Sequence, residues 1–457
     1  MCAAPLSPLT DVRTAERVNL IIMPSTDPID LETANFLLSP TGRAATQALH
    51  NANLSEADTL PLLTELRRHF PVVQAGALLT LARLRQRAAA KFPFAEQLFL
   101  TAEALEQATA WPVAEHRTAW LDRYAPPGCI LDLGCGIGGD TLALAQRRPV
   151  IAFEQDSVRL RFAQANAEAL GVEKQIEFRQ ADWTELLANG HLPTAAAAYA
   201  DPSRRAAGKR IFSLYQMQPP LPTLLRLQQQ IPAVAVKVMP GVQDAELPTH
   251  CGVEFISHAG VCKEAILWFG ALAIQPRWAS IHNATGWQSI NASGTKPPLG
   301  LLQPGQFLHE PDPAVIRAGA FDELCQRLAA FLFNAEIAYL VSPHLKLDPL
   351  VQTFLIQEVH PFSLKVLNQR LQALSIREVE LKKRGFPVEP EELRKRLKLP
   401  NRGRAGVVIF TQQANEHSDH TRHPATHIML ICERVSQNGS KGNDYRSGSS
   451  GAGGNLG

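Results

Sequence analysis

The sequence lacks the marks of a secreted or membrane-spanning protein. Its seven cysteines are odd in number, lie scattered along 457 residues and form no C-x-x-C pair. This pattern argues against a disulfide framework and against a structural zinc site. No apolar run approaches the ~20 residues that a membrane helix needs, and residues 18–23 are too short a run for the core of a signal peptide. We therefore expect a cytoplasmic protein with no metal and no membrane partner.

A strong excess of either charge is also missing. The chain has 45 Lys and Arg against 43 Asp and Glu, for a net charge of +2, so any nucleic-acid surface must be local. A hydrophobic fraction of 45% with 19% charged residues is typical of globular proteins. The length predicts ~3 domains.

Glycine is concentrated at one place, the stretch 129–140, with the sequence CILDLGCGIGGD. Its apolar start predicts a strand buried on both faces of a parallel sheet. Gly134, Gly136 and Gly138 then form a turn before a helix-forming run, and Cys135 fills a small-residue position between them. Because glycine has no side chain and tolerates positive φ, a ligand can lie against this backbone. The stretch predicts a nucleotide-binding loop.

Acidic residues indicate which nucleotide. Gly134, Gly136 and Gly139 also satisfy the dinucleotide fingerprint G-x-G-x-x-G, but Asp132 would repel a pyrophosphate there and attract a cation. Glu154, followed by Gln155, ends the next apolar run and is placed to accept hydrogen bonds from ribose hydroxyls; Asp156 is an alternative acid or a helix cap.

Two further acids follow later strands of the predicted sheet. Asp182 comes after a strand and can meet an adenine amino group, while the neighbouring Trp183 either stacks on adenine or packs in the core. Asp201 and Pro202 close the following strand. With these motifs in order, the chain resembles the class I S-adenosylmethionine-dependent methyltransferases. The resemblance implies S-adenosyl-L-methionine as cofactor.

The strand pattern agrees with that family's α/β fold, a Rossmann-like seven-stranded sheet with one reversed strand. Apolar strands alternate with amphipathic helices from 111 to 272. The last two predicted strands are separated only by residues 260–263, which cannot hold a crossover helix, so they must form an antiparallel hairpin.

Composition and periodicity predict the other domains. We expect a disordered leader at 1–28, a helical domain at 29–110, the methyltransferase domain at 111–272, a small α/β linker domain at 273–345, an α/β domain at 346–435 and a disordered tail at 436–457.

Stretches spread over residues 30 to 435, among them AAAKFPFAEQLFLTAEALEQAT, ADPSRR and VELKKRGFPVEPEELRKRLKL, resemble bacterial class I methyltransferases with a C-terminal THUMP-like domain. By analogy with THUMP domains, the resemblance implies RNA (tRNA or rRNA) as substrate. Basic residues near the predicted glycine turn and helix of that domain are candidate phosphate contacts: Lys382, Lys383, Arg384, Arg394 and Lys395.

The predicted catalytic residues are Asp201, Pro202 and Arg204. Amino-group methyltransferases carry a second proline and an aromatic residue at this motif, whereas this chain has Ser203 and Arg204. Asp201 can still orient a nucleophile, and Arg204 or Arg205 can stack on a base or hold a phosphate. The altered motif leaves two alternatives open: a non-catalytic RNA-binding protein with a relic pocket, and a methyltransferase acting on protein or small molecules.

Three positions outside these motifs are ambiguous. Lys237 interrupts an apolar strand and either reaches the active-site edge or pairs with a carboxylate. His116 and Arg117 are candidate contacts for the cofactor carboxylate, although a surface helix is the preferred interpretation.

Overall fold

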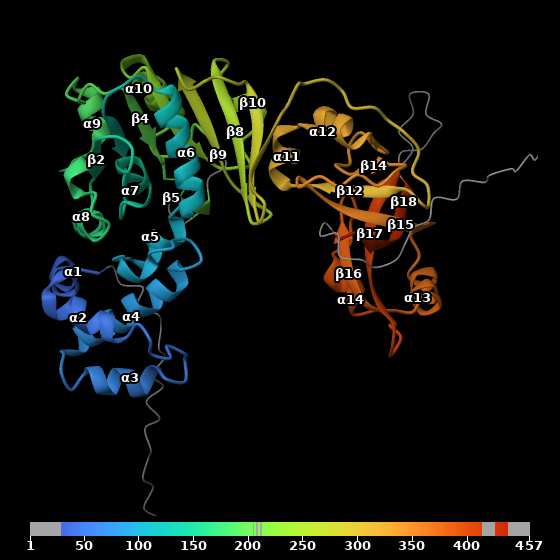
Figure 1. The fold of residues 1–457 in the computed structure, drawn as a ribbon, viewed down its shortest axis with the longest axis horizontal. Coiled ribbons are helices and arrows are strands. Elements are labelled where there is room, and N and C mark those ends of the chain that lie inside the picture. Colours follow the sequence, from blue (N-terminus) through green and yellow to red (C-terminus); the bar gives the residue numbers. More distant parts are fainter. Residues whose placement is uncertain (1–28, 204, 207–208, 211–212, 414–425, 437–457) are drawn as a thin grey trace, which may run out of the picture.

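The computed structural model describes residues 29–203, 205–206, 209–210, 213–413 and 426–436. Figure 1 shows a large central sheet with a helical domain at one end and a second sheet at the other. The expected leader lies outside the described residues, as does all of the expected tail except Ser436.

The N-terminal part is helical, as predicted. Asp30 Oδ1 accepts a hydrogen bond from Thr33 N (2.7 Å), and Ser39 Oγ accepts one from Gly42 N (3.1 Å), so both side chains cap helix starts. The elements are α1 (Leu31–Leu38), α2 (Pro40–Ala48), α3 (Thr59–Leu66), α4 (Val72–Ala88), η1 (Ala95–Gln97) and α5 (Ala102–Gln107).

The core of this helical domain is continuous with the methyltransferase-like part. Leu78 and Phe92 belong to the same apolar cluster as Leu142 and Phe162, which lie on α7 (Gly139–Ala145) and α8 (Ser157–Ala169). The buried Asn166 amide bonds the Phe99 backbone and donates to Ile137 O (2.9 Å), within the glycine loop. The helical domain is therefore packed against the glycine loop.

The central sheet contains all seven predicted strands. The order is β11-β10-β8-β9-β7-β4-β1-β2-β3. Strands β3, β2, β1, β4 and β7 are parallel, and β9 is antiparallel to both β7 and β8, which confirms the predicted hairpin. The bounds are β1 (Ile130–Leu133), β2 (Val150–Glu154), β3 (Ile176–Gln180), β4 (Ala197–Ala200), β7 (Ala233–Val238), β8 (Cys251–His258), β9 (Val261–Gly270), β10 (Arg277–Asn283) and β11 (Gly286–Asn291).

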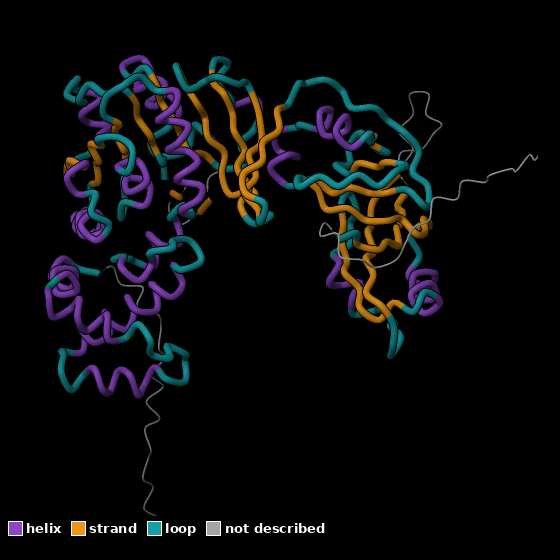
Figure 2. The backbone as a smooth tube through the Cα atoms, viewed as in Figure 1, coloured by secondary structure: helices purple, strands orange, loops and turns teal. Residues whose placement is uncertain are grey.

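Helices cover both faces of this sheet (Figure 2). One face packs against α6 (Trp111–Tyr124), α7 and α8. The other packs against α9 (Trp183–Ala188), α10 (Leu221–Gln230), α11 (Pro313–Ala318) and α12 (Phe321–Leu328). Short elements connect these: η2 (Glu173–Gln175), η3 (Asp244–Glu246), and the two-stranded pair β5 (Arg205–Ala206) and β6 (Lys209–Arg210).

The sheet has two more strands than predicted. β10 pairs with β8 in parallel, and β11 pairs with β10 antiparallel. Both fall in 273–345, where a separate linker domain was expected, while β12 from the same range joins the second sheet. The expected linker is thus divided between two sheets, because its apolar strands find partners in both.

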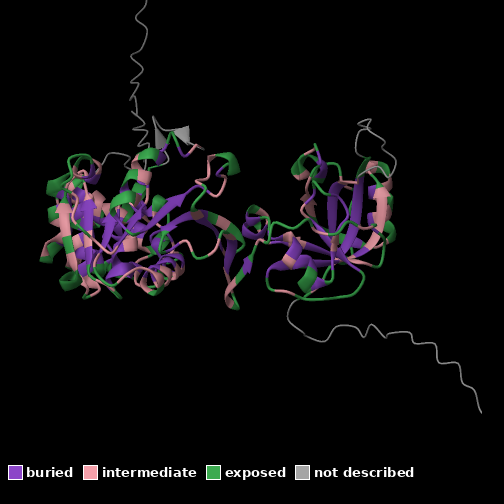
Figure 3. Cartoon of the chain, turned by 90° about the horizontal axis from the view of Figure 1, so that it is seen from above, coloured by how far each residue is buried: buried purple, intermediate pink, exposed green. Residues whose placement is uncertain are grey.

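The second sheet has the order β13-β14-β12-β15-β18-β17-β16. Every strand and helix predicted at 346–435 is present, although the second helix ends early, at Arg394. The elements are β12 (Phe307–Pro311), β13 (Phe331–Leu332), β14 (Leu340–Ser342), β15 (Val351–Pro361), α13 (Leu364–Ala373), β16 (Ile376–Lys383), α14 (Pro390–Arg394), β17 (Arg404–Gln413) and β18 (Thr426–Arg434). Figure 3 shows buried residues concentrated in the strands of both sheets.

Candidate active site

The glycine loop joins β1 to α7 at the carboxyl edge of the central sheet. Gly134, Gly136 and Gly138 have φ of 95°, 58° and 91°, the left-handed region that favours glycine. A Cβ added at Gly134 or Gly136 would meet no atom within 4 Å, so the backbone there faces open space. Gly138 is different, because a Cβ there would lie 3.4 Å from that of Ala163. The loop leaves room for a ligand on one side and packs tightly on the other.

Glu154 at the end of β2 holds the loop in place. Its Oε2 accepts a hydrogen bond from Gly136 N (2.9 Å), and its Oε1 accepts from Gln155 N (2.8 Å) and Asp156 N (2.9 Å). A carboxylate has about four acceptor sites, so Glu154 retains capacity for a ribose hydroxyl. The competing interpretation of Asp156 as a cap is confirmed: its Oδ1 accepts from Arg159 N (2.8 Å) at the start of α8.

Asp132 on β1 is 1% exposed. Thr141 Oγ1 donates a hydrogen bond to its Oδ2 (2.5 Å). Burial, with the nearby Asp140 and Asp201 carboxylates, raises the pKa of Asp132 to about 7, against the opposing effects of Thr141 and Arg117. A cation that binds beside this carboxyl group would therefore favour loss of its proton.

The third predicted acid, Asp182, caps α9. Its Oδ1 accepts from Thr184 N (2.8 Å) and from Thr184 Oγ1 (2.6 Å). Trp183 is 6% exposed and belongs to the core cluster, which is the core-packing alternative of the sequence analysis. Cys135 is also buried, and burial raises the pKa of its thiol.

Asp201 and Lys237 come together at the carboxyl ends of β4 and β7. Lys237 Nζ lies 2.7 Å from Asp201 Oδ2 and 3.0 Å from Thr109 Oγ1. The two sequence interpretations of Lys237 therefore both hold, since it reaches this edge and pairs with a carboxylate there. Pro202 is buried, and Arg204 lies outside the described residues.

Arg117 has a role that its place in the sequence does not reveal. A surface helix was preferred for this residue, but Arg117 is 2% exposed and forms ion pairs with Asp140 and Glu264. Its guanidinium carbon lies 4.4 Å from the centre of the Tyr199 ring. The preference was wrong because α6 lies across β9, which supplies a carboxylate 147 residues away. Nothing local in the sequence marks that pairing.

Four of the predicted RNA contacts have carboxylate partners within the chain. Lys382 and Arg384 face Glu310 (2.6 and 3.9 Å), Lys383 faces Glu389 (2.5 Å), and Arg394 faces Glu391 (3.3 Å). Lys395 is exposed at the end of α14. The carboxylates of Glu389 and Glu391 are well exposed, so their pairs with Lys383 and Arg394 are worth about 0–1 kcal/mol and a phosphate can displace them. Lys382 and Glu310 are each only 18% exposed, so this range does not apply to their pair.

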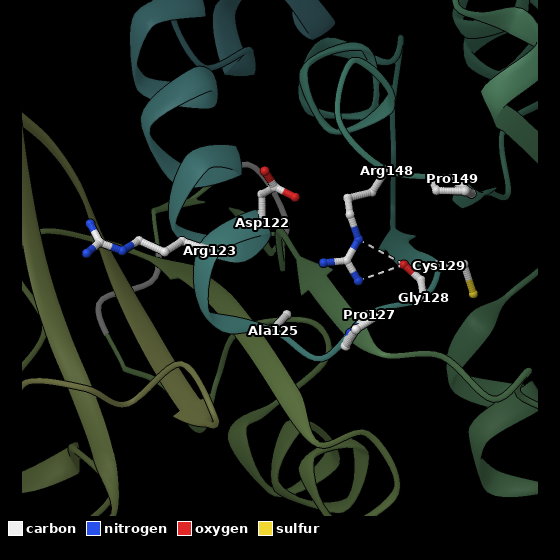
Figure 4. Close-up of a pocket in the computed structure, with 8 residues that line it drawn as sticks. All are labelled: Asp122, Arg123, Ala125, Pro127, Gly128, Cys129, Arg148 and Pro149. Carbon is white, nitrogen blue, oxygen red and sulfur yellow. Dashed lines mark hydrogen bonds between the residues drawn. The ribbon is translucent and has the colours of Figure 1, made fainter.

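A wide hollow lies at the opposite edge of the central sheet, beside the amino end of β1 (Figure 4). Arg148 projects into it and donates to Gly128 O through Nε (2.9 Å) and Nη2 (2.7 Å). The hollow is therefore remote from the glycine loop. Across the described residues, no cluster of His, Cys, Asp and Glu is arranged to hold a metal ion, and no helix there has both the length and the apolar character to span a membrane.

Family models match three parts of the chain. The RNA cap guanine-N2 methyltransferase family matches residues 127–201, which include the glycine loop and end at Asp201. The THUMP domain-like family matches 351–434. A domain of unknown function matches 30–88, in the helical part.

Relatives match over longer stretches. Two proteins from different strains of Mycobacterium tuberculosis, each named an uncharacterized S-adenosylmethionine-dependent methyltransferase, are 33% identical to this chain over 341 residues, covering 71% of this chain and 90% of each relative. An uncharacterized RNA methyltransferase from Parasynechococcus marenigrum is 33% identical over 103 residues, or 22% of each protein.

The solved structure of a candidate methyltransferase from Porphyromonas gingivalis W83 has a similar fold. It aligns with a TM-score of 0.68 and 19% identity, covering 87% of this chain and 99% of the other. At this identity the likeness concerns the fold, and it agrees with the class I methyltransferase fold predicted from the sequence.

Proposed function

We propose that this chain, which belongs to the S-adenosylmethionine-dependent methyltransferases, methylates RNA, with tRNA or rRNA presented by residues 346–435. Its cofactor is S-adenosyl-L-methionine. The observation that carries the RNA proposal is the THUMP domain-like match at 351–434, in the same chain as a match to an RNA methyltransferase family at 127–201. The Parasynechococcus relative adds support over its 103 residues.

The residues at the carboxyl edge of the central sheet, around the glycine loop, suit this cofactor. Open space beside Gly134 and Gly136 accommodates a ligand against the backbone, and the buried Asp132 attracts a cation more than a phosphate. We assign cofactor binding to the following residues: Asp132, Gly134, Cys135, Gly136, Gly138, Glu154, Gln155 and Asp182. Trp183, which packs in the core, is left out of this assignment.

The bound cofactor supplies an activated methyl group, so the protein's task is to hold the acceptor in line and exclude water. We assign this task to Asp201, Pro202 and Arg204. The Asp201 carboxylate accepts a hydrogen bond from the acceptor's N–H or O–H, while the Lys237 ammonium, 2.7 Å away, fixes its position. Lys382, Lys383, Arg384, Arg394 and Lys395 are assigned to phosphate contacts, and the reaction is assigned to the cytoplasm.

The test uses the full chain, cofactor labelled in its methyl group, and total RNA from a strain lacking the protein. Label in RNA is expected, and Asp201→Ala should abolish it. The matched control is Glu177→Ala, which removes an exposed carboxylate paired with Arg179 at an edge strand and should leave labelling unchanged. Label appearing only in protein or small molecules would refute the RNA proposal. Nucleoside mass spectrometry would then identify the methylated base.

The relic-pocket alternative has its own test. Titration calorimetry should detect cofactor binding to the wild-type chain and its loss in Asp132→Ala. RNA binding without any cofactor binding would favour the relic.

A further inference from the structure

Lys237 has polar partners on two sides at the carboxyl edge of the central sheet. The residue as a whole is 3% exposed, and a buried lysine needs partners for its charge and its donors. One partner is the Asp201 carboxylate of the central sheet, at 2.7 Å; the other is Thr109 Oγ1, at 3.0 Å. Thr109 is not part of the sheet, because it lies in the segment between α5 and α6. The sheet and the helical part thus meet at one ammonium group.

Lys91, in the turn that follows α4, fixes that segment. Its Nζ donates to the carbonyl oxygens of Leu105 (2.7 Å), Glu106 (3.1 Å) and Ala108 (2.8 Å), which uses all three ammonium donors. Its own carbonyl accepts from Trp111 N (2.8 Å). The chain is therefore tied to Lys91 on both sides of Thr109.

The exposure of the pair is uneven. Lys237 has a side-chain exposure of 4%, whereas that of Asp201 is 28%. Burying both charges would add to the desolvation cost of the pair, so uneven exposure alone does not define a function, but it does decide which partner another molecule can reach. Here the ammonium and the threonine hydroxyl lie inside, while the carboxylate reaches the surface at the edge that carries the glycine loop.

We infer that the helical domain is a working part of the active site, in which Lys91 and Thr109 position Lys237, and Lys237 positions the Asp201 carboxylate toward the methyl acceptor. This inference rests on the proposed function in one respect, the role of Asp201. Thr109, Lys91 and Lys237 are positioning residues, since they act through Asp201.

The test compares Thr109→Val, which removes the hydroxyl at nearly constant volume, with Thr109→Ser, which keeps it. Misplacing a catalytic group by about 1 Å costs up to about 100-fold in rate, so we expect kcat to fall about 10-fold in Thr109→Val. In Lys237→Met, kcat should fall further than in Thr109→Val. Thr109→Ser should recover most of the lost rate. KM for the acceptor and the cofactor dissociation constant should change less than about threefold, because neither site is built from Thr109.

The matched control is Thr46→Val. Thr46 is also buried in the helical domain, and its hydroxyl donates to Gly42 O (2.9 Å) within α2. The Thr46→Val substitution should lower the melting temperature without lowering kcat of the folded fraction. Wild-type kcat in Thr109→Val, or parallel losses in both variants, would overturn the inference.

A structural readout separates this inference from the proposed function. Crystal structures of the wild-type chain and Thr109→Val are compared at the pair. We expect Asp201 and Lys237 to move apart or to adopt more than one arrangement in the variant. An unchanged pair would overturn the positioning role even if no acceptor were found. Absence of label in RNA, with label in another acceptor, would refute only the RNA proposal, and the variants would then be assayed on that acceptor.

Discussion

The carboxyl group of Asp132 should make cofactor binding depend on pH. Its pKa is raised to about 7, chiefly by burial, whereas in an unfolded chain it is about 4. A bound cation favours the ionised form, so affinity should rise up to about tenfold per pH unit below pH 7 and level off above it. Calorimetry in two buffers of different ionisation enthalpy should show proton release near pH 6. Asp132→Asn should remove the pH dependence.

The same pKa shift has a consequence for the cofactor-free chain. Between pH about 4 and about 7 the native state holds a proton on Asp132 that the unfolded state has released. The stabilising contribution of this group is therefore fully present at acid pH and is lost as pH rises through about 7. A thermal scan that showed the Asp132→Asn variant losing stability in step with wild type over this range would contradict the assignment.

Two glycines should respond oppositely to alanine. Gly138 has φ of 91°, where a side chain costs about 1–2 kcal/mol, and it also approaches Ala163. Gly76 lies inside α4 with nothing within 4 Å of an added Cβ, so alanine should gain up to about 1 kcal/mol there. Thermal unfolding should show a lower melting temperature for Gly138→Ala and an unchanged or higher one for Gly76→Ala. A drop of equal size in both would contradict the explanation from φ.

Among the elements, α6 depends on one buried charge. Arg117 neutralises Asp140, on α7, and Glu264, on β9, so it joins three elements. Arg117→Met would leave both carboxylates without this partner, which costs about 3–5 kcal/mol for a buried pair. The melting temperature should fall strongly.

The control for this prediction is Arg147→Met. Arg147 pairs with Asp122 at 3.5 Å, and the two side chains are 49% and 35% exposed. Such a pair contributes about 0–1 kcal/mol, so stability should hardly change. Equal effects of the two substitutions would show that α6 does not depend on the buried charge.

Elements that follow from local pattern were predicted well. The seven strands, the hairpin between β8 and β9, and the helix start at Pro313 are all present, because alternation, a short connection and proline at a first turn are local signals. Partnerships between distant segments were not predictable. The strands β10 and β11 were placed in a linker because the sequence does not say which sheet a strand joins. The burial of Arg117 and the bond from Lys237 to Thr109 were missed for the same reason.

The whole molecule has a net charge of only +2, so RNA binding must depend on a local basic surface and not on the overall charge. If residues 346–435 bind RNA, affinity should fall with salt, and each lost phosphate contact should reduce the slope of log affinity against log salt by about 0.7 for a single strand. The triple variant Lys383→Gln, Arg394→Gln and Lys395→Gln should therefore show a slope smaller by about 2 in filter binding.

The control removes the same charge elsewhere. Arg67→Gln, Arg68→Gln and Arg147→Gln together take away three exposed cations from the helical part and from the central sheet's amino edge. The slope should stay near that of the wild type. Equal slopes for the two triple variants would mean that RNA does not dock at β16 and α14.

The apolar core of the central sheet extends to the near edge of the second sheet, which also has two apolar clusters of its own. Ala279 and Ile281 of β10 belong to the same cluster as Ala314 and Val315 of α11 and as Val351 of β15. Arg277 adds bonds to the carbonyl oxygens of Arg317 and Ala318, at 2.7 and 2.9 Å. If the C-terminal sheet binds one feature of an RNA, this connection would hold the active site at a fixed distance from that feature. The methylated nucleotide would then be selected by its distance from the bound feature more than by the identity of its base.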